Sequence, residues 1–261
     1  MMLNTRVEFS IVIPMFNNSV NIVSTLDSCV KQSYKPKEII IVDDCSADTS
    51  VEVVDRWIQS NVSKIDITLY KLEKNAGPSA ARNKGWSLAT GAYVAFLDAD
   101  DIFTFDKLAV VNKVLLQYQN VVLLGHEYGV HKVKKKSSNP LKRLTTKSFL
   151  RKNYFTTSAV VVKREVSERF DKTMRYTEDQ DLFLRLTKRY NKTYYLKEEL
   201  VLRERDMNTG GGLSGNLWAM RSGEVKMYRK FCKANGLMVL FPIFLAYSLS
   251  KHLLKLLKGS V

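Results

Sequence analysis

Cysteine is scarce in this sequence, and its positions suit neither a disulfide framework nor a metal site. Cys29, Cys45 and Cys232 are odd in number and lack metal-ligand spacing, which predicts reduced thiols. The first nine residues also lack the apolar stretch of a signal peptide. We therefore expect the protein to be cytoplasmic.

Glycine-rich phosphate-binding loops are absent as well. The chain has neither the dinucleotide-binding motif nor a P-loop, which excludes those two ways of holding a nucleotide through backbone amides. A bound phosphate would instead be met by a metal ion and by basic side chains.

Acidic residues are outnumbered. The 261 residues include 41 Lys or Arg but only 26 Asp or Glu, giving a formal net charge of +15. Such an excess predicts a polyanionic partner: nucleic acid, an acidic membrane surface or a phosphorylated substrate. Residues 131–152 are strongly basic and contain Ser137–Pro140, which predicts a mobile surface loop. The sequence leaves open whether this charge serves a partner or is merely solvated.

The C-terminal segment is apolar but short. Residues 237–249 are almost wholly apolar, yet they fall short of the roughly 20 residues that a bilayer-spanning helix needs. Lys251, Lys255 and Lys258 then fall on one helical face, and leucines cover the other side. That pattern is typical of an interfacial helix with its lysines toward acidic headgroups. The alternative is a helix packed on the core, and we favour the membrane interpretation.

The first hundred residues alternate regularly between strand-like and helix-like segments. Apolar runs predict strands at residues 10–14, 38–42, 65–70 and 94–97, with helices between them. Parallel strands joined by right-handed crossovers follow from this order. Strands at 121–125 and 156–163 and helices at about 105–118 and from 177 are expected beyond. The sequence predicts an α/β fold, a single Rossmann-like domain with a mostly parallel central sheet.

Three aspartates directly follow the fourth apolar run. In open α/β sheets, ligands bind just beyond the carboxyl ends of the strands, where Asp98, Asp100 and Asp101 would lie. Asp98 and Asp100 are two residues apart, so both side chains would face one oxygen-loving divalent ion. Alternatively, one aspartate caps the helix that starts near Phe105. A cap needs only one acid, so we favour a metal site and keep Asp101 as the candidate cap.

A second acidic segment opens the helix near residue 177. Thr177 and Gln180 fit a capping box. Asp179 shares a helical stripe with Leu182 and Leu186, so it either interacts with the helix dipole or faces a cleft. Spacing alone favours the dipole interpretation.

Five short segments, in order, resemble the inverting, nucleotide-sugar-dependent glycosyltransferases of family 2, which have the A-type glycosyltransferase fold. The segments are Ser10–Asn17, Ile41–Ser46, Gly77–Gly85, the aspartates after residue 97, and Glu178–Asp179. They span about residues 9 to 190, and the resemblance is to enzymes of bacterial surface-polysaccharide synthesis. It implies a catalytic domain over residues 1–215, divided into a nucleotide-sugar half (about 1–101) and an acceptor half (about 102–215). Residues 216–261 would form a helical, membrane-interfacial segment.

The resemblance also implies individual roles. Phe16 would stack on the nucleobase, where the family usually has tyrosine, and Asp44 would read the base as uracil. Asp100 would bind the Mg²⁺ or Mn²⁺ that bridges the diphosphate, and Asp179 would be the general base. Cys45 stands where the family commonly has glycine. The donor-binding residues would be Pro14, Phe16, Asn17, Asp44, Arg82, Asp98 and Ala99.

The sequence thus predicts an inverting, metal-dependent glycosyltransferase. It would move a sugar from a UDP-sugar to a lipid-linked or polysaccharide acceptor at the inner face of the cell membrane, with no nucleic-acid partner. A sugar nucleotidyltransferase is an alternative, but residues 14–19 lack its glycine-rich, lysine-bearing loop. A basic nucleic-acid-binding module would interleave its lysines with aromatic residues on one face. A sugar-nucleotide binder without catalysis also stays open.

Overall fold

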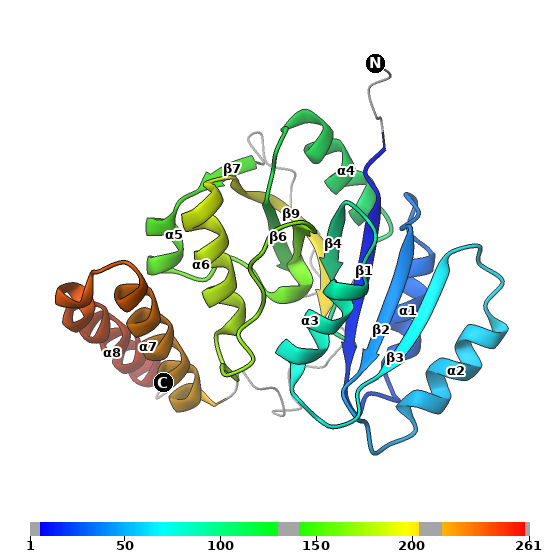
Figure 1. Cartoon of the computed structure of the whole chain (residues 1–261), viewed down its shortest axis with the longest axis horizontal. Helices are drawn as coiled ribbons and strands as arrows, with labels where there is room; N and C mark the ends of the chain where they lie inside the picture. Colours follow the sequence, from blue (N-terminus) through cyan, green and yellow to red (C-terminus); the bar gives the residue numbers. More distant parts are fainter. Residues whose placement is uncertain (1–5, 130–140, 204–215, 259–261) are drawn as a thin grey trace.

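One mixed β-sheet lies between two layers of helices (Figure 1). The computed structural model describes residues 6–129, 141–203 and 216–258. The nine strands are β1 (Phe9–Met15), β2 (Glu38–Asp43), β3 (Asp66–Lys71), β4 (Tyr93–Phe96), β5 (Asp101–Phe103), β6 (Leu123–Gly129), β7 (Leu141–Leu144), β8 (Val160–Lys163) and β9 (Thr193–Arg203). The helices are α1 (Ile22–Val30), α2 (Ser50–Ser60), α3 (Pro78–Leu88), α4 (Lys107–Gln117), α5 (Thr146–Arg151), α6 (Glu178–Tyr190), α7 (Leu217–Ala234) and α8 (Phe241–Lys258), with 3-10 turns η1 (Thr157–Ala159) and η3 (Met238–Leu240).

The first half of the sheet is parallel, as predicted. β1 pairs in parallel with β2 and β4, and β2 pairs in parallel with β3, with α1, α2 and α3 as the connections. The alternating strands and helices predicted for the first hundred residues are therefore confirmed. Their carboxyl ends lie at one edge of the sheet.

The prediction of a mostly parallel sheet is wrong for the second half. The strand order is β3-β2-β1-β4-β8-β6-β9-β5, with β7 beside β9, and four of the eight described pairs are antiparallel. β8 runs antiparallel between β4 and β6. The strand direction therefore reverses directly beside β4, the strand that leads to Asp98. The apolar pattern does not reveal strand direction, and it misses the short strands β5 and β7 and the polar strand β9.

Alternate residues of the buried strands serve two separate cores. On one face, Ile11, Ile39 and Ala95 pack with residues of α1, α2 and α4. On the other, Val12 and Phe96 pack with residues of α3, α5, α6 and α7. Because both faces are covered by helices, the central strands β1, β4 and β8 are almost continuously apolar, as is typical of such sheets.

The basic segment is more ordered than the sequence predicts. Of residues 131–152, those up to 140 lie outside the described part, but residues 141–151 form β7 and α5 rather than a loop. β7 pairs with β9, and Phe149 of α5 is fully buried against α6. Within the described part of the segment, the basic side chains are exposed: Lys142, Arg143, Lys147, Arg151 and Lys152.

The two C-terminal helices differ in their packing. Met227 and Tyr228 of α7 belong to the same core as α6, and Lys230 of α7 pairs with Asp171 and with Asp181 of α6. α8 rests mainly on α7, where Ser248 and Lys251 both bind Glu224. Lys251 therefore does not face outward as expected. The side chains of Lys255 and Lys258 lie outside the described part.

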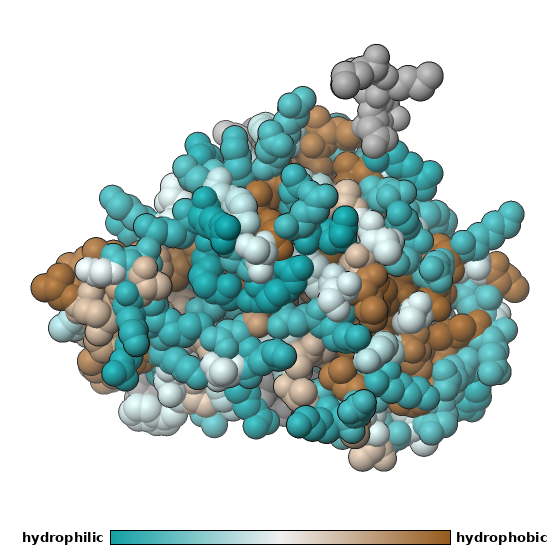
Figure 2. All heavy atoms as spheres, in the orientation of Figure 1, coloured by the Kyte–Doolittle hydropathy of each residue, from teal (hydrophilic) through white to brown (hydrophobic). Residues whose placement is uncertain are grey.

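Hydrophobic surface gathers where η3 and α8 form one end of the molecule (Figure 2). The exposed residues there include Met238, Val239, Ile243, Leu249 and Leu253. Across residues 6–129, 141–203 and 216–258, no helix joins the length and the apolar content that crossing a membrane requires.

Candidate active site

The loops that follow β1 and β2 are bonded to each other at the carboxyl edge of the sheet. The backbone N–H of Asn17 donates to the Ser46 hydroxyl at 2.9 Å, and Asn17 Oδ1 accepts from the Ala47 N–H at 2.8 Å. Pro14 lies on β1 beside Val42 of β2. Phe16, in the loop that follows β1, is 49% exposed, so its ring is accessible to a planar ligand. These donor-side candidates lie together.

Asp44 holds the turn that starts α3. Its two carboxylate oxygens accept from the backbone N–H groups of Ala76 (2.7 Å) and Gly77 (2.8 Å), and the side chain is buried. Gly77 has a φ of 84°, a conformation that favours glycine, and Pro78 begins the helix. Asp44 thus positions the helix that carries Arg82, and its role in reading a base stays a prediction.

Cys45 occupies a strained backbone position next to Asp44. Its φ of 62° lies in the left-handed region, which residues with a Cβ rarely adopt. Glycine, common here in the family that the sequence resembles, would adopt this conformation freely. Cys45 therefore adopts a backbone conformation that suits the glycine of that family.

Arg82 joins the two acidic segments of the sequence. Its guanidinium donates from Nη2 to Asp98 at 2.8 Å and from Nη1 to Glu178 at 3.1 Å. The residue is only 5% exposed, and its Nε has no partner among the described atoms. Burial lowers the pKa of Arg82, but the two carboxylates more than offset this and raise it, so it stays cationic. The sequence brings Arg82 forward but does not reveal that Glu178 binds it.

Glu178 and Asp179 are carboxyl groups with raised pKa values. Burial raises the pKa of Glu178 to about 7, aided by the charge of Asp179 and opposed by Arg82. Burial also raises the pKa of Asp179, whose Oδ1 accepts from the Gln180 N–H at 2.7 Å. Perturbed carboxyl groups in a cluster are candidates for acid–base work.

Asn153 is a site residue that sequence reasoning missed. Its Nδ2 donates to Asp179 Oδ2 at 3.0 Å. It lies just after α5 and no motif marks it; only the packing of α5 on α6 brings it there.

The predicted capping box is wrong. Thr177 is the N-cap residue of α6, but its hydroxyl donates to Tyr176 O, and Gln180 Nε2 donates to Phe149 O.

Asp101 does not cap a helix, contrary to one sequence interpretation. It lies in β5, and its buried carboxylate accepts from the hydroxyls of Tyr128 (2.6 Å) and Ser158 (2.5 Å). The same Ser158 hydroxyl accepts the N–H of Asp98, and Thr25 donates to Ala99 O. These hydrogen bonds hold the aspartate turn, residues 98–101, in place from its buried side. Burial raises the pKa of Asp101 to about 7, aided by the charge of Asp98.

The turn suits a divalent cation that arrives with a phosphate ligand. Asp98 and Asp100 are both half-buried at the sheet edge, and Asp98 also binds Arg82. Within the described residues no group of three or more His, Cys, Asp or Glu side chains could form a cage around a metal. Mg²⁺ commonly needs only one or two carboxylates when substrate phosphates and water complete its shell. The carboxylates present fit that kind of site.

Comparison with known proteins gives the same family. The family model described as Glycosyl transferase family 2 matches residues 10–198. The amylovoran biosynthesis glycosyltransferase AmsB of Erwinia amylovora is 35% identical over 199 residues, 70% of this chain and 64% of AmsB. The putative teichuronic acid biosynthesis glycosyltransferase TuaG of Bacillus subtilis is 40% identical over 109 residues, 41% of each chain. The matches thus span less than two thirds of these relatives.

Solved structures show the same fold at low identity. A crystal structure of S. aureus TarS 1-349 in complex with UDP-GlcNAc aligns with a TM-score of 0.69 at 20% identity, covering 94% of this chain and 72% of that one. A mannosyltransferase from Pyrobaculum calidifontis in complex with GDP-Man and Mn²⁺ aligns with a TM-score of 0.66 at 17% identity, covering 98% and 80%.

The raised pKa of Glu178 predicts a pH dependence of stability. An acid whose folded-state pKa is about 7, against an ordinary value of 4.5, binds its proton more tightly in the folded state. The free energy of unfolding should therefore fall as the pH rises from about 4.5 through 7. Urea unfolding at several pH values should show a shallower fall for Glu178→Gln than for the wild type. The exposed control Glu73→Gln should follow the wild type, and parallel curves for all three proteins would contradict the assignment.

Proposed function

This chain belongs to glycosyl transferase family 2, and from that membership we propose that it transfers a sugar from a UDP-sugar to a hydroxyl of a lipid-linked or polysaccharide acceptor, with inversion. The observation that carries this proposal is the bridge made by Arg82. It joins Asp98, on the candidate donor side, to Glu178, beside the candidate base. Donor and acceptor chemistry would then meet in one cluster.

The donor would occupy the carboxyl edge of the sheet. Phe16 offers an exposed ring for stacking on the base. Asp44 is buried, and its backbone N–H donates to the carbonyl oxygen of Met15, the residue before Phe16. Pro14, Asn17 and Ala99 would shape the same edge. Arg82 and Asp98 would lie near the phosphates and the ribose. TarS, which shares the fold, has been crystallised with UDP-GlcNAc, which supports a uridine nucleotide.

Transfer would be a single displacement. Asp179 would remove the proton from the acceptor hydroxyl as its oxygen attacks the anomeric carbon from the face opposite the leaving group. Its raised pKa makes it a stronger base than an ordinary aspartate, and Asn153 and the Gln180 N–H hold the carboxylate in place. A divalent ion held by Asp100 would supply positive charge for the departing nucleoside diphosphate.

Replacing Asp179 tests the catalytic assignment. Asp179→Asn should keep UDP binding by calorimetry but lose at least about 100-fold in transfer, the usual scale of general base catalysis. Transfer would be measured as UDP release in a screen of common sugar nucleotides with Mg²⁺ or Mn²⁺. The exposed control Asp66→Asn should stay active. Full activity of Asp179→Asn would place the base elsewhere, and UDP binding by the wild type without any transfer would favour a silent binder.

Replacing Asp100 tests the metal assignment. Asp100→Ala should lower the affinity for UDP measured with Mn²⁺ by about tenfold or more, the effect of one lost charged contact. Without metal, the two proteins should bind UDP equally. Asp106→Ala, an exposed aspartate six positions along, serves as the matched control. Equal Mn²⁺-dependent affinities for wild type and Asp100→Ala would refute a role for Asp100 in metal binding.

We further propose that η3 and α8 bind the inner face of the cell membrane. Their exposed apolar side chains lie next to basic α5, because the Tyr247 hydroxyl of α8 donates to Arg151 O. Lys147, Arg151 and Lys152 are exposed there. Apolar contact flanked by cations is the usual recipe for attachment to anionic lipid.

Vesicle binding tests this surface. Val239 and Ile243 are 82% and 64% exposed, so Val239→Ser/Ile243→Ser should weaken binding to phosphatidylglycerol-containing vesicles by about tenfold or more. Sedimentation with vesicles would measure this. Val62→Ser, at a 97% exposed position in the loop before β3, should bind as the wild type does. An unchanged affinity for the double variant would refute the surface.

A further inference from the structure

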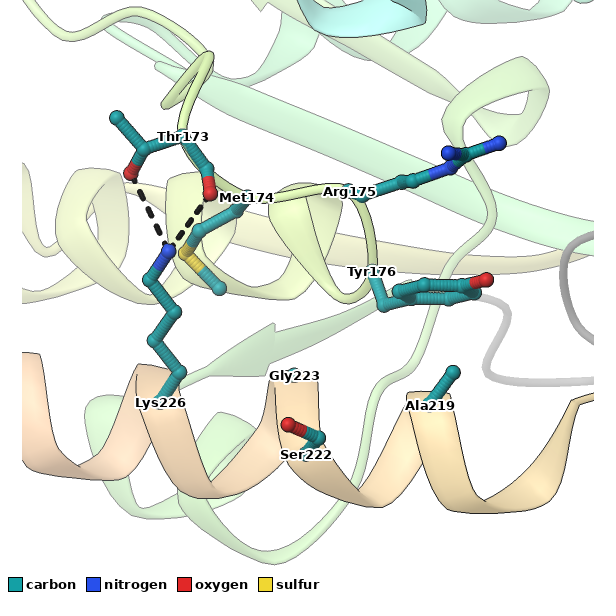
Figure 3. Close-up of a pocket in the computed structure, with 8 residues that line it drawn as sticks. All are labelled: Thr173, Met174, Arg175, Tyr176, Ala219, Ser222, Gly223 and Lys226. Atoms are coloured by element: carbon teal, nitrogen blue, oxygen red, sulfur yellow. Dashed lines mark hydrogen bonds between the residues drawn. The ribbon is translucent and has the colours of Figure 1, made fainter.

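A small cavity lies beside the turn that carries the candidate base. It has a volume of about 190 Å³ and separates residues 173–176 from the first half of α7 (Figure 3). Tyr176, one of its walls, is three residues before Asp179. Its lining residues are Thr173, Met174, Arg175, Tyr176, Ala219, Ser222, Gly223 and Lys226.

The wall formed by α7 is fixed tightly against this turn. A Cβ added to Gly223 would lie 2.7 Å from Tyr176 O and 2.8 Å from Thr177 Oγ1, so only glycine allows the approach. Lys230, farther along α7, pairs with Asp171 and with Asp181 of α6. These contacts therefore fix the position of α7, which lines the cavity, relative to the first turn of α6.

The charge of the lining favours an anion. The lining includes Arg175 and Lys226 but no carboxylate. Lys226 Nζ donates to Thr173 O at 2.6 Å and to Thr173 Oγ1 at 3.4 Å (Figure 3), which leaves one proton of the ammonium for a ligand. Arg175 is exposed and has no hydrogen bond or ion pair within the described residues. Its five donors are thus open to a carboxylate or a phosphate.

The rest of the lining suits a sugar ring. Figure 3 shows Arg175 and Tyr176 extending in the same direction, with the Ala219 side chain pointing from α7 toward the tyrosine. Tyr176, Met174 and Ala219 offer apolar surface, and the Ser222 hydroxyl offers a hydrogen bond. A volume of about 190 Å³ is below the range of about 300–1,000 Å³ that holds a drug-sized ligand. One ring with its acidic substituent matches this size.

We propose that this cavity is an acceptor subsite, which binds a sugar residue carrying a carboxylate or phosphate group. The inference rests on the proposed function and deepens it, because it assigns an acidic acceptor glycan to the enzyme. The donor candidates lie on the other side of Arg82, at the ends of β1, β2 and β4. The acidic residue would lie on the Asp179 side, where the acceptor hydroxyl must be deprotonated.

Methyl NMR of the full chain tests the subsite directly. In protein labelled with ¹³C at the methionine methyl groups, Met174 is identified by the loss of its signal in Met174→Leu. D-glucuronate and glucose 1-phosphate should shift this signal on titration, and neutral D-glucose should not. Arg175→Gln and Lys226→Gln should each weaken the response about tenfold, the effect of one charged hydrogen bond. Arg229→Gln, an exposed arginine of α7 outside the cavity, should titrate as the wild type does.

Three results would overturn the subsite. The first is an equal response to D-glucose, and the second is an unchanged titration in Arg175→Gln and Lys226→Gln. The third is an equal response to inorganic phosphate, which would reveal an anion site without sugar recognition. UDP binding, measured separately by calorimetry, tests the proposed function itself. Intact UDP binding without a response to the acidic sugars would refute the subsite alone.

Discussion

The buried guanidinium of Arg82 is the interaction on which the arrangement of the site depends. Desolvating an arginine is costly unless carboxylates surround it, and Asp98 and Glu178 do so from two different elements. Glu178 is 96 residues away in the chain. Losing either carboxylate would leave a buried cation partly unpaired, so α3, the aspartate turn and α6 hold one another in place. The catalytic candidate Asp179 is positioned by the same bridge.

The reversal of chain direction at β8 puts the supporting residues beneath the site. A strand parallel to β4 would have its carboxyl end at this edge, as β1, β2 and β4 do. Antiparallel β8 instead begins there, which places Ser158, just before it, between Asp98 and Asp101. Asn153, in the segment between α5 and β8, donates a hydrogen bond to Asp179. The half of the sheet that departs from the predicted topology is thus the half that completes the candidate site.

Local pattern predicted much of the chain. The strands at residues 10–14, 38–42 and 65–70 and the helices between them were within reach because apolar residues recur with the period of each structure. The family was recognisable from five short segments, and the family match over residues 10–198 confirms it. The failures have physical causes: β5 and β7 are too short to show a period, and β9 is too polar. Thr177 begins α6 as predicted, yet its left-handed φ of 56° turns the hydroxyl away from the capping position.

By itself, the sequence determined which residues lie at the carboxyl edge of the sheet, because residues that directly follow buried parallel strands all lie at that edge. Asp98 and Asp100 were identifiable in this way, and Phe16 and Asp44 were identifiable through the family resemblance. Only the tertiary structure decided which of them bind one another. Arg82 takes Glu178 as a partner, Asp101 is buried under the turn, and Lys251 faces Glu224 rather than a membrane. Such pairings depend on how distant elements pack, and no local period in the sequence encodes that.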